Sequence, residues 1–169
     1  MHEFNELIQH CTAFSLEALN KLQKHTTDSL QTSSSTELVK TMQMIQLQKA
    51  ISAVGMFSIF DAILQDQLQC ENGFRKASQI LDSQGATDLE ENFLNLQLAV
   101  NVLKHGRGPS YDKLVQKAAT LPFKIKSLDK CFFNEGDISE ISTLIEVDDA
   151  FVSLCAKTID EVFAYIQKQ

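Results

Sequence analysis

The most regular pattern of apolar and polar positions lies in residues 87–105. The apolar positions follow steps of four and three, which places them on one stripe of an α-helix: Leu89, Phe93, Leu96, Val100 and Leu103. Such a stripe predicts a helix of about 18 residues whose apolar side faces a core. Thr87 and Glu90 have the spacing of a capping box at its start, and Gly106 can take the left-handed conformation that ends a helix.

The N-terminal half of the chain predicts two further long helices. Residues 3–25 carry an apolar stripe that we expect to pack against the rest of the protein: Phe4, Leu7, Cys11, Phe14, Ala18 and Leu22. Residues 26–36 are rich in Ser and Thr and predict a flexible connection. The second helix spans 37–69, with Ser35 or Thr36 as its cap. Its segment 50–64 is apolar almost all round, which predicts the central core helix.

Shorter elements follow, together with one last long helix. Residues 74–84 predict a short helix, and Ser110 can cap another over 111–119. The pattern loosens in 121–145, where we expect a small hairpin or an irregular arm. A long helix starts near Val147, where neighbouring acids suit the positive end of the helix dipole.

These elements predict an all-α fold. The chain has 169 residues, 44% hydrophobic content, six glycines and two prolines, so it is long enough for one packed domain and has few breaks. We therefore predict a single domain over 1–169, an antiparallel bundle of four long and two short helices.

The sequence also gives expectations about cellular location, membrane insertion, the cysteines and metal binding. No cationic stretch followed by an apolar run opens the chain, so we expect a cytoplasmic protein. Segment 50–64 is too short and too polar for a membrane span, which needs about 20 residues. The four cysteines lack CxxC spacing and are expected to be reduced. The histidines form no ligand pair, so we predict no metal and no cofactor.

Positive charge is concentrated in one segment of this acidic chain, whose net charge is −7. Between Lys104 and Lys130, seven lysines and arginines stand against two aspartates. This segment can present one face to an anion such as RNA, or it can be a solvated lysine surface.

A polar line runs beside the apolar stripe of residues 87–105. Gln97, Asn101 and His105 lie four apart, so the line ends at the histidine. His105 is either a hydrogen-bonded group at the helix C-terminus or a catalytic base. Asp61 is the one carboxylate in segment 50–64. It is either a structural carboxylate, hydrogen-bonded to a neighbouring helix or turned to solvent, or part of a site beside His105.

The motif Asn-x-x-x-His near the end of a late core helix resembles that of the HEPN superfamily, whose ribonuclease members carry Arg-polar-x-x-x-His there. The stretch VNVLKHGRGPSYDKL, with GMFSIFDAILQ and TLIEVDDAF, is similar to a group of bacterial proteins of that kind. Asn101 matches the polar residue and His105 the histidine, whereas Val100 occupies the arginine position. Arg107 or Lys104 can substitute for that arginine, by a folded-back turn or across a homodimer.

The resemblance implies a protein that binds RNA or cleaves it without a metal, in bacterial defence or toxin-antitoxin regulation. Its implied partners are a second copy, RNA and a protein such as an antitoxin. The alternative is a non-catalytic interaction or dimerisation module. A small-ligand enzyme has less support, because no cofactor loop or nucleophile-base pair is present. The predicted site contains catalytic and binding residues: Asn101, His105 and Arg107, with Lys104, Ser110 and Asp61.

Overall fold

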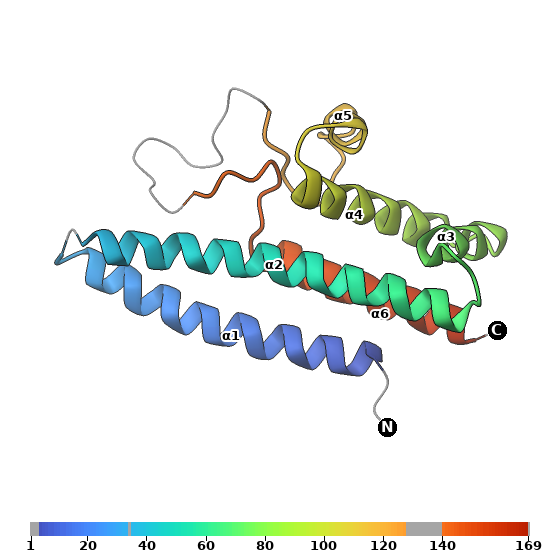
Figure 1. The fold of residues 1–169 in the computed structure, drawn as a ribbon, viewed down its shortest axis with the longest axis horizontal. Helices are drawn as coiled ribbons and strands as arrows, with labels where there is room; N and C mark the ends of the chain where they lie inside the picture. The colour runs from blue at the N-terminus through green and yellow to red at the C-terminus, as the bar shows by residue number, and fades with distance from the viewer. Residues whose placement is uncertain (1–3, 34, 128–139, 169) are drawn as a thin grey trace.

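The computed structural model describes residues 4–33, 35–127 and 140–168. Figure 1 shows the helices of this part of the chain: α1 (Phe4–Leu30), α2 (Thr36–Gln67), α3 (Gly73–Ser83), α4 (Thr87–His105), α5 (Pro109–Gln116) and α6 (Asp149–Gln167). Four are long and two are short. The predicted all-α fold is therefore confirmed.

The helices lie in layers around α2 and α6 (Figure 1). Helix α1 packs on α2 and α6, and within the described residues it contacts none of α3, α4 and α5. Helices α3 and α4 cover the other side of α2 and α6, and α5 packs on α4. The four long helices alternate in direction along the chain, as predicted: α1 and α2 are antiparallel, α4 runs opposite to α2, and α6 runs opposite to α4, so α2 and α6 share one direction (Figure 1).

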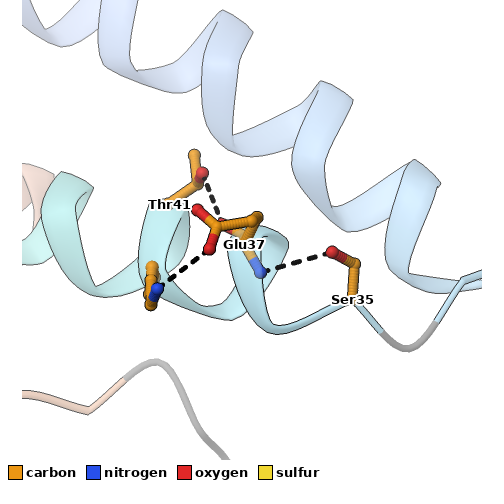
Figure 2. Close-up of polar contacts among 4 residues, drawn as sticks. Ser35, Glu37 and Thr41 are labelled. Atoms are coloured by element: carbon orange, nitrogen blue, oxygen red, sulfur yellow. Dashed lines mark hydrogen bonds and ion pairs between the residues drawn. The ribbon is translucent and has the colours of Figure 1, made fainter.

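The start of α2 agrees with its predicted cap. Figure 2 shows the Oγ of Ser35 accepting a hydrogen bond from the backbone N–H of Glu37, at 3.2 Å. The hydroxyl of Thr41 donates to the carbonyl oxygen of Glu37 at 2.8 Å, and the Nζ of Lys40 lies 2.8 Å from its carboxylate. The Ser35 side chain thus satisfies one of the backbone N–H groups that the first turn leaves free.

Two other predicted caps are wrong. Helix α4 begins at Thr87 as predicted, but Ala86 stands at the cap position and no side chain caps the helix. Because Thr87 already has helical backbone, it cannot act as the first residue of a capping box. Ser110 is likewise inside α5, which begins at Pro109, a residue that has no N–H to leave unsatisfied.

Helix α1 continues five residues beyond the predicted end. The Thr26 hydroxyl donates to the carbonyl oxygen of Leu22 at 2.8 Å, and the Ser29 hydroxyl donates to that of His25 at 2.9 Å. These bonds keep both hydroxyls satisfied within the helix, so the Ser/Thr-rich composition does not end it. The connection to α2 therefore starts after Leu30 and is shorter than the predicted segment 26–36.

Aromatic rings fill the core between α2, α3 and α4. The Phe93 ring lies 5.4 Å from that of Phe74, 6.1 Å from Phe60 and 6.3 Å from Phe57, measured between centroids. Gly73 permits the close approach of α3 to α2, because a Cβ there would stand 2.6 Å from the Cβ of Leu64. The predicted stripe of α4 faces this core, with Phe93, Leu96 and Val100 buried.

The predicted packing side of α1 is only partly right, since Phe4 of the stripe stacks on Phe60 at 6.1 Å but most of the stripe is exposed. Phe14 is 75% exposed, and Leu7, Cys11 and Ala18 are also exposed, whereas Thr12 of the adjoining side is buried. Helix α1 turns this adjoining side towards α2 and α6, where Ile8 and Leu16 pack against the core and Asn5 donates to Asp160 at 2.8 Å.

The segment 50–64 of α2 also departs from its prediction, since it is not enclosed on all sides. Ile51 is 53% exposed, and Ile59 is exposed as well. Helix α6 shares the central position, with buried residues along its length. We call the exposed apolar surface of the first two helices the α1–α2 face; its members are Leu7, Cys11, Phe14, Ala18, Met44, Leu47, Ile51 and Ile59.

The predicted hairpin or arm is a minimal pairing in the described residues. Ile125 and Ile145 form a single antiparallel bridge, flanked by a hydrogen bond from Lys126 N to Leu144 O at 2.8 Å. The Tyr111 hydroxyl donates to the carbonyl oxygen of Lys126 at 2.9 Å, which ties α5 to this pairing. The middle of the predicted segment, 128–139, lies outside the described residues.

Candidate functional site

The candidate site lies where α4 ends and turns into α5. Gly106 has a φ of 72°, and its N–H still bonds to Val102 O at 2.8 Å, so the helix ends at His105. Positive φ is readily adopted only by glycine. We call Asn101, Lys104, His105 and Arg107 the α4 end cluster.

All four side chains of the α4 end cluster are exposed. Among the described residues no side-chain hydrogen bond or ion pair engages any of them. In this part of the chain the His105 side chain therefore has no hydrogen-bond partner, so the interpretation of His105 as a hydrogen-bonded group at the helix C-terminus is not supported there. An imidazole held free and open to solvent is available to a ligand.

Val100 occupies the position of the arginine in the HEPN pattern, and it is 4% exposed. It belongs to the buried stripe of α4, whereas Asn101 and His105 lie on the exposed side. A cation for this cluster has to come from Lys104, Arg107 or another segment.

The basic segment divides into paired and unpaired cations. Lysines on its far side form ion pairs with acids of other elements: Lys117 with Glu91 at 3.0 Å, Lys124 with Glu146 at 2.8 Å, and Lys126 with Glu140. Hydrogen bonding to Glu146 raises the pKa of Lys124.

Lys104, Arg107 and Lys113 have no acidic partner within the described residues. Unpaired positive charge is thus concentrated around the turn between α4 and α5. Lys130 lies outside the described residues.

Asp61 is not part of the α4 end cluster. Its Oδ1 accepts a hydrogen bond from Phe74 N at 3.2 Å, and its Oδ2 accepts one from Gln65 Nε2 at 2.9 Å. The Phe74 ring contacts Phe93, which precedes His105 by twelve residues or about 18 Å of helix. The structure therefore supports the first interpretation of Asp61, a carboxylate bonded to a neighbouring helix, and separates it from His105.

Ser110 follows the turn after Arg107 and is half-buried. Within the described residues, no hydrogen bond or ion pair of its side chain supports its predicted role as a binding residue. The structure brings together Asn101, Lys104, His105 and Arg107 at one helix end, and leaves Asp61 apart.

An open groove of about 460 Å³ runs between α3 and α4. Its lining includes four polar residues of α3 and three of α4: Arg75, Ser78, Gln79 and Asp82, and Glu90, Gln97 and Asn101. The predicted polar line thus forms one wall, and the groove ends at Asn101, one turn before His105. The α3 wall was not predicted, because nothing in the local pattern shows which helix will lie beside the line.

Two polar atoms beside this groove lack partners within the described residues. Ser78 Oγ and Gln97 Nε2 are both buried from solvent and neither makes a hydrogen bond there. Buried polar groups are usually paired, so both atoms have unused hydrogen-bonding capacity next to the groove.

The described residues contain no group of three histidine, cysteine or acidic side chains arranged to hold a metal ion. Cys11, Cys70 and Cys155 are free thiols. Burial raises the pKa of Cys155, which keeps that thiol protonated and unreactive.

Helix α2 contains an 18-residue window with a mean hydropathy of 1.4, so by length and composition alone it qualifies to cross a membrane. The core helix of a globular protein has the same composition, and eight residues of α2 are buried here. The absence of a membrane partner and the cytoplasmic location both remain predictions.

Comparison with protein-family models, with curated proteins and with solved structures gives no match. The resemblance to the HEPN superfamily therefore rests on the residues quoted above.

Proposed function

We propose that this protein is an HEPN-like protein that binds RNA at the α4 end cluster and cleaves it with His105. The observation that carries the proposal is the exposed, unengaged His105 beside the unpaired cations Lys104, Arg107 and Lys113. An anionic strand gains attraction from such cations even on an acidic protein, because they are unpaired whereas Lys117, Lys124 and Lys126 are neutralised by nearby acids.

The chemistry needs one base and one cation at the scissile phosphate. The His105 imidazole accepts the proton of the ribose 2′-hydroxyl, whose oxygen then attacks phosphorus while the bond to the 5′-oxygen breaks. That leaving oxygen takes a proton from the imidazolium or from water, giving a cyclic phosphate and a 5′-hydroxyl. Arg107 stabilises the negative charge that builds on the phosphate oxygens, and the amide of Asn101 orients the phosphate.

Replacing His105 by alanine is expected to reduce RNA cleavage by about 10²- to 10⁴-fold, the usual contribution of a general base. The assay follows mixed single-stranded RNA with purified protein in a chelator, because the resemblance implies a reaction without metal. Arg107→Ala should weaken binding or cleavage more than Lys113→Ala, since Lys113 supplies only general attraction that salt screens.

Equal, salt-dependent losses for Arg107→Ala and Lys113→Ala would reduce Arg107 to one charge among several. Cleavage that persists unchanged in the His105→Ala protein would contradict the catalytic role. The wider setting that we propose is bacterial defence or toxin-antitoxin regulation, with an antitoxin as protein partner.

The second candidate is a dimerisation module, and the α1–α2 face favours it. Between Lys40 and Asp61 the one charged residue of α2 is Lys49, which is buried. A groove between the two helices, lined by Cys11, Gly55 and Ile59 among others, adjoins this surface, and Lys49 is the one charged residue in its lining. Copies of a chain with net charge −7 repel each other least across a surface with few charges, so a second copy is the partner that we propose.

Ile51→Asp is therefore expected to turn a dimer into a monomer of 18.9 kDa, because a charge is costly in an apolar interface. Val115→Asp is the matched control, since Val115 is an exposed apolar residue of α5 outside the α1–α2 face. Light scattering after size-exclusion chromatography measures both masses. A wild-type protein that is monomeric at high concentration would rule out this dimer, and a dimer without RNA binding or cleavage would favour the module.

A further inference from the structure

The groove between α3 and α4 is polarised along its length. Arg75 stands near the start of α3, and Asp82 stands seven residues later, about 10 Å along the helix. Glu90, in the first turn of α4, lines the groove as well, and because only residues 84–86 join α3 to α4, this turn follows the end of α3 that carries Asp82. Arg75, Asp82 and Glu90 form no ion pair within the described residues, so each charge is free for a ligand.

Carboxamides flank the cationic end. The side-chain oxygen of Asn72 accepts a hydrogen bond from Arg75 N at 2.9 Å, which leaves the Asn72 amide N–H groups to donate. Asn101 lines the groove from α4, eleven residues or about 16 Å of helix away from Glu90. This end therefore offers one guanidinium and two amides, which suit the oxygens of a phosphate.

The middle of the groove combines apolar and polar surface. Phe74 and Leu94 supply apolar side chains, and Leu94 is exposed. The unpartnered Ser78 Oγ and Gln97 Nε2 lie between the two charged ends. A flat ring with polar edges is a ligand that uses both kinds of surface.

From this arrangement we propose that the α3–α4 groove binds a nucleotide, with its phosphate at Arg75 and its base towards Asp82 and Glu90. Carboxylates accept hydrogen bonds from amino groups of bases, as they do from cytosine. Adenine, cytosine and guanine carry such a group and uracil does not, so the groove prefers the first three. The volume of about 460 Å³ lies in the range of small-molecule sites.

The nucleotide is either free or one unit of an RNA strand. In the second case the inference rests on the proposed function and deepens it. The groove ends at Asn101, one turn before His105, so it would hold a nucleotide next to the cleaved phosphate. In the first case the groove is a separate ligand site.

The test titrates the full chain with the four nucleoside 5′-monophosphates, inorganic phosphate and a short single-stranded RNA, using calorimetry and NMR shifts of the α3 and α4 amides. Arg75→Ala should lower the affinity for the preferred probe by about tenfold, as expected for a lost charge-assisted bond. Lys76→Ala is the matched control, because Lys76 is an exposed cation of the same helix that does not line the groove. It should change the affinity less than twofold.

Saturable binding of a mononucleotide that Arg75→Ala weakens supports a free-nucleotide site, and the same loss seen with RNA alone supports a subsite of the strand. Glu90→Gln should remove the preference against uridine monophosphate while leaving inorganic phosphate binding unchanged. Equal losses from Arg75→Ala and Lys76→Ala, phosphate binding as tightly as the nucleotides, or no binding of any probe would each overturn the inference. His105→Ala separates the two proposals, because it should abolish cleavage and leave mononucleotide binding intact.

Discussion

Phe93→Ala is expected to lower the free energy of unfolding by about 3–5 kcal/mol. The ring is fully buried and contacts three other aromatic rings, from Phe57, Phe60 and Phe74. Its removal leaves a cavity between α2, α3 and α4 that these rings can fill only in part, and it also removes favourable edge-to-face contacts. Phe57→Ala should have an effect of similar size, because Phe57 is fully buried in the same cluster.

Denaturant midpoints at constant m-value measure this loss, which corresponds to about 2–4 °C of melting temperature per kcal/mol. Phe14→Ala is the matched control at low protein concentration. It removes the same ring from a position that is 75% exposed, so the expected change is about 0.5 kcal/mol or less. Similar midpoints for the Phe93 and Phe14 variants would show that α4 does not pack on the core as described.

Asp149→Ala is expected to lower the free energy of unfolding by about 3 kcal/mol, because it leaves the charge of Lys49 buried without a partner. The side chain of Lys49 is 4% exposed, and its Nζ lies 2.8 Å from Asp149 Oδ1. Gln23 Oε1 is 3.3 Å from the same nitrogen, and Asn20 donates to Asp149 Oδ2 at 2.6 Å. This loss of stability is at the low end of the range for buried ion pairs, because the Asp149 side chain is 40% exposed and solvent screens its charge.

Lys49 is buried and Asp149 is partly exposed, so substitutions of the two residues should differ in their effect, and each serves as a control for the other. Lys49→Met removes the buried charge itself and leaves an aspartate that solvent reaches, so the expected loss is about 1 kcal/mol or less. Glu17→Gln breaks an exposed pair with Lys21 and should change stability little. A larger loss from Lys49→Met than from Asp149→Ala would mean that the pair is not buried as described.

The Asp149 pair also predicts a pH dependence. Partial burial acts to raise the pKa of Asp149, but hydrogen bonds from Lys49 and Asn20, with the Lys49 charge, lower it overall. A carboxylate whose pKa is lower in the folded state stabilises the fold above its unfolded pKa of about 3.9, and this stabilisation is lost as the pH falls through the folded pKa. The stabilities of the wild type and Asp149→Asn should therefore differ at pH 7 and converge below about pH 4, as measured by urea unfolding. A constant difference across that range would contradict the assigned pKa shift.

Local chemistry was sufficient to predict most helix positions. The stripe of Phe93, Leu96 and Val100 faces the core because its 3.6-residue period leaves only one way to bury it. The caps at Ser35 and the acidic start of α6 depend on groups within a few residues of each helix start, so they too can be inferred from the sequence. For the same reason the sequence located His105 at a helix end, since Gly106 follows it directly.

Tertiary structure alone decided which helices lie side by side, and with that the surroundings of the site. The stripe of α1 with Phe14 has the same period as that of α4, yet most of it stays exposed because α2 and α6 accept the adjoining side of the helix. Asp61 bonds to α3 instead of approaching His105, a choice that depends on where α3 packs. The pairing of Lys49 with Asp149 joins residues a hundred positions apart.

The groove between α3 and α4, which Arg75 lines, is also a feature that only the tertiary structure decides. It exists because α3 folds back along the polar line of α4, and a period within one helix carries no information about its neighbour. Periodicity and capping are local and survive in the sequence, whereas clefts and long-range ion pairs arise from the relative placement of helices, which the whole core determines.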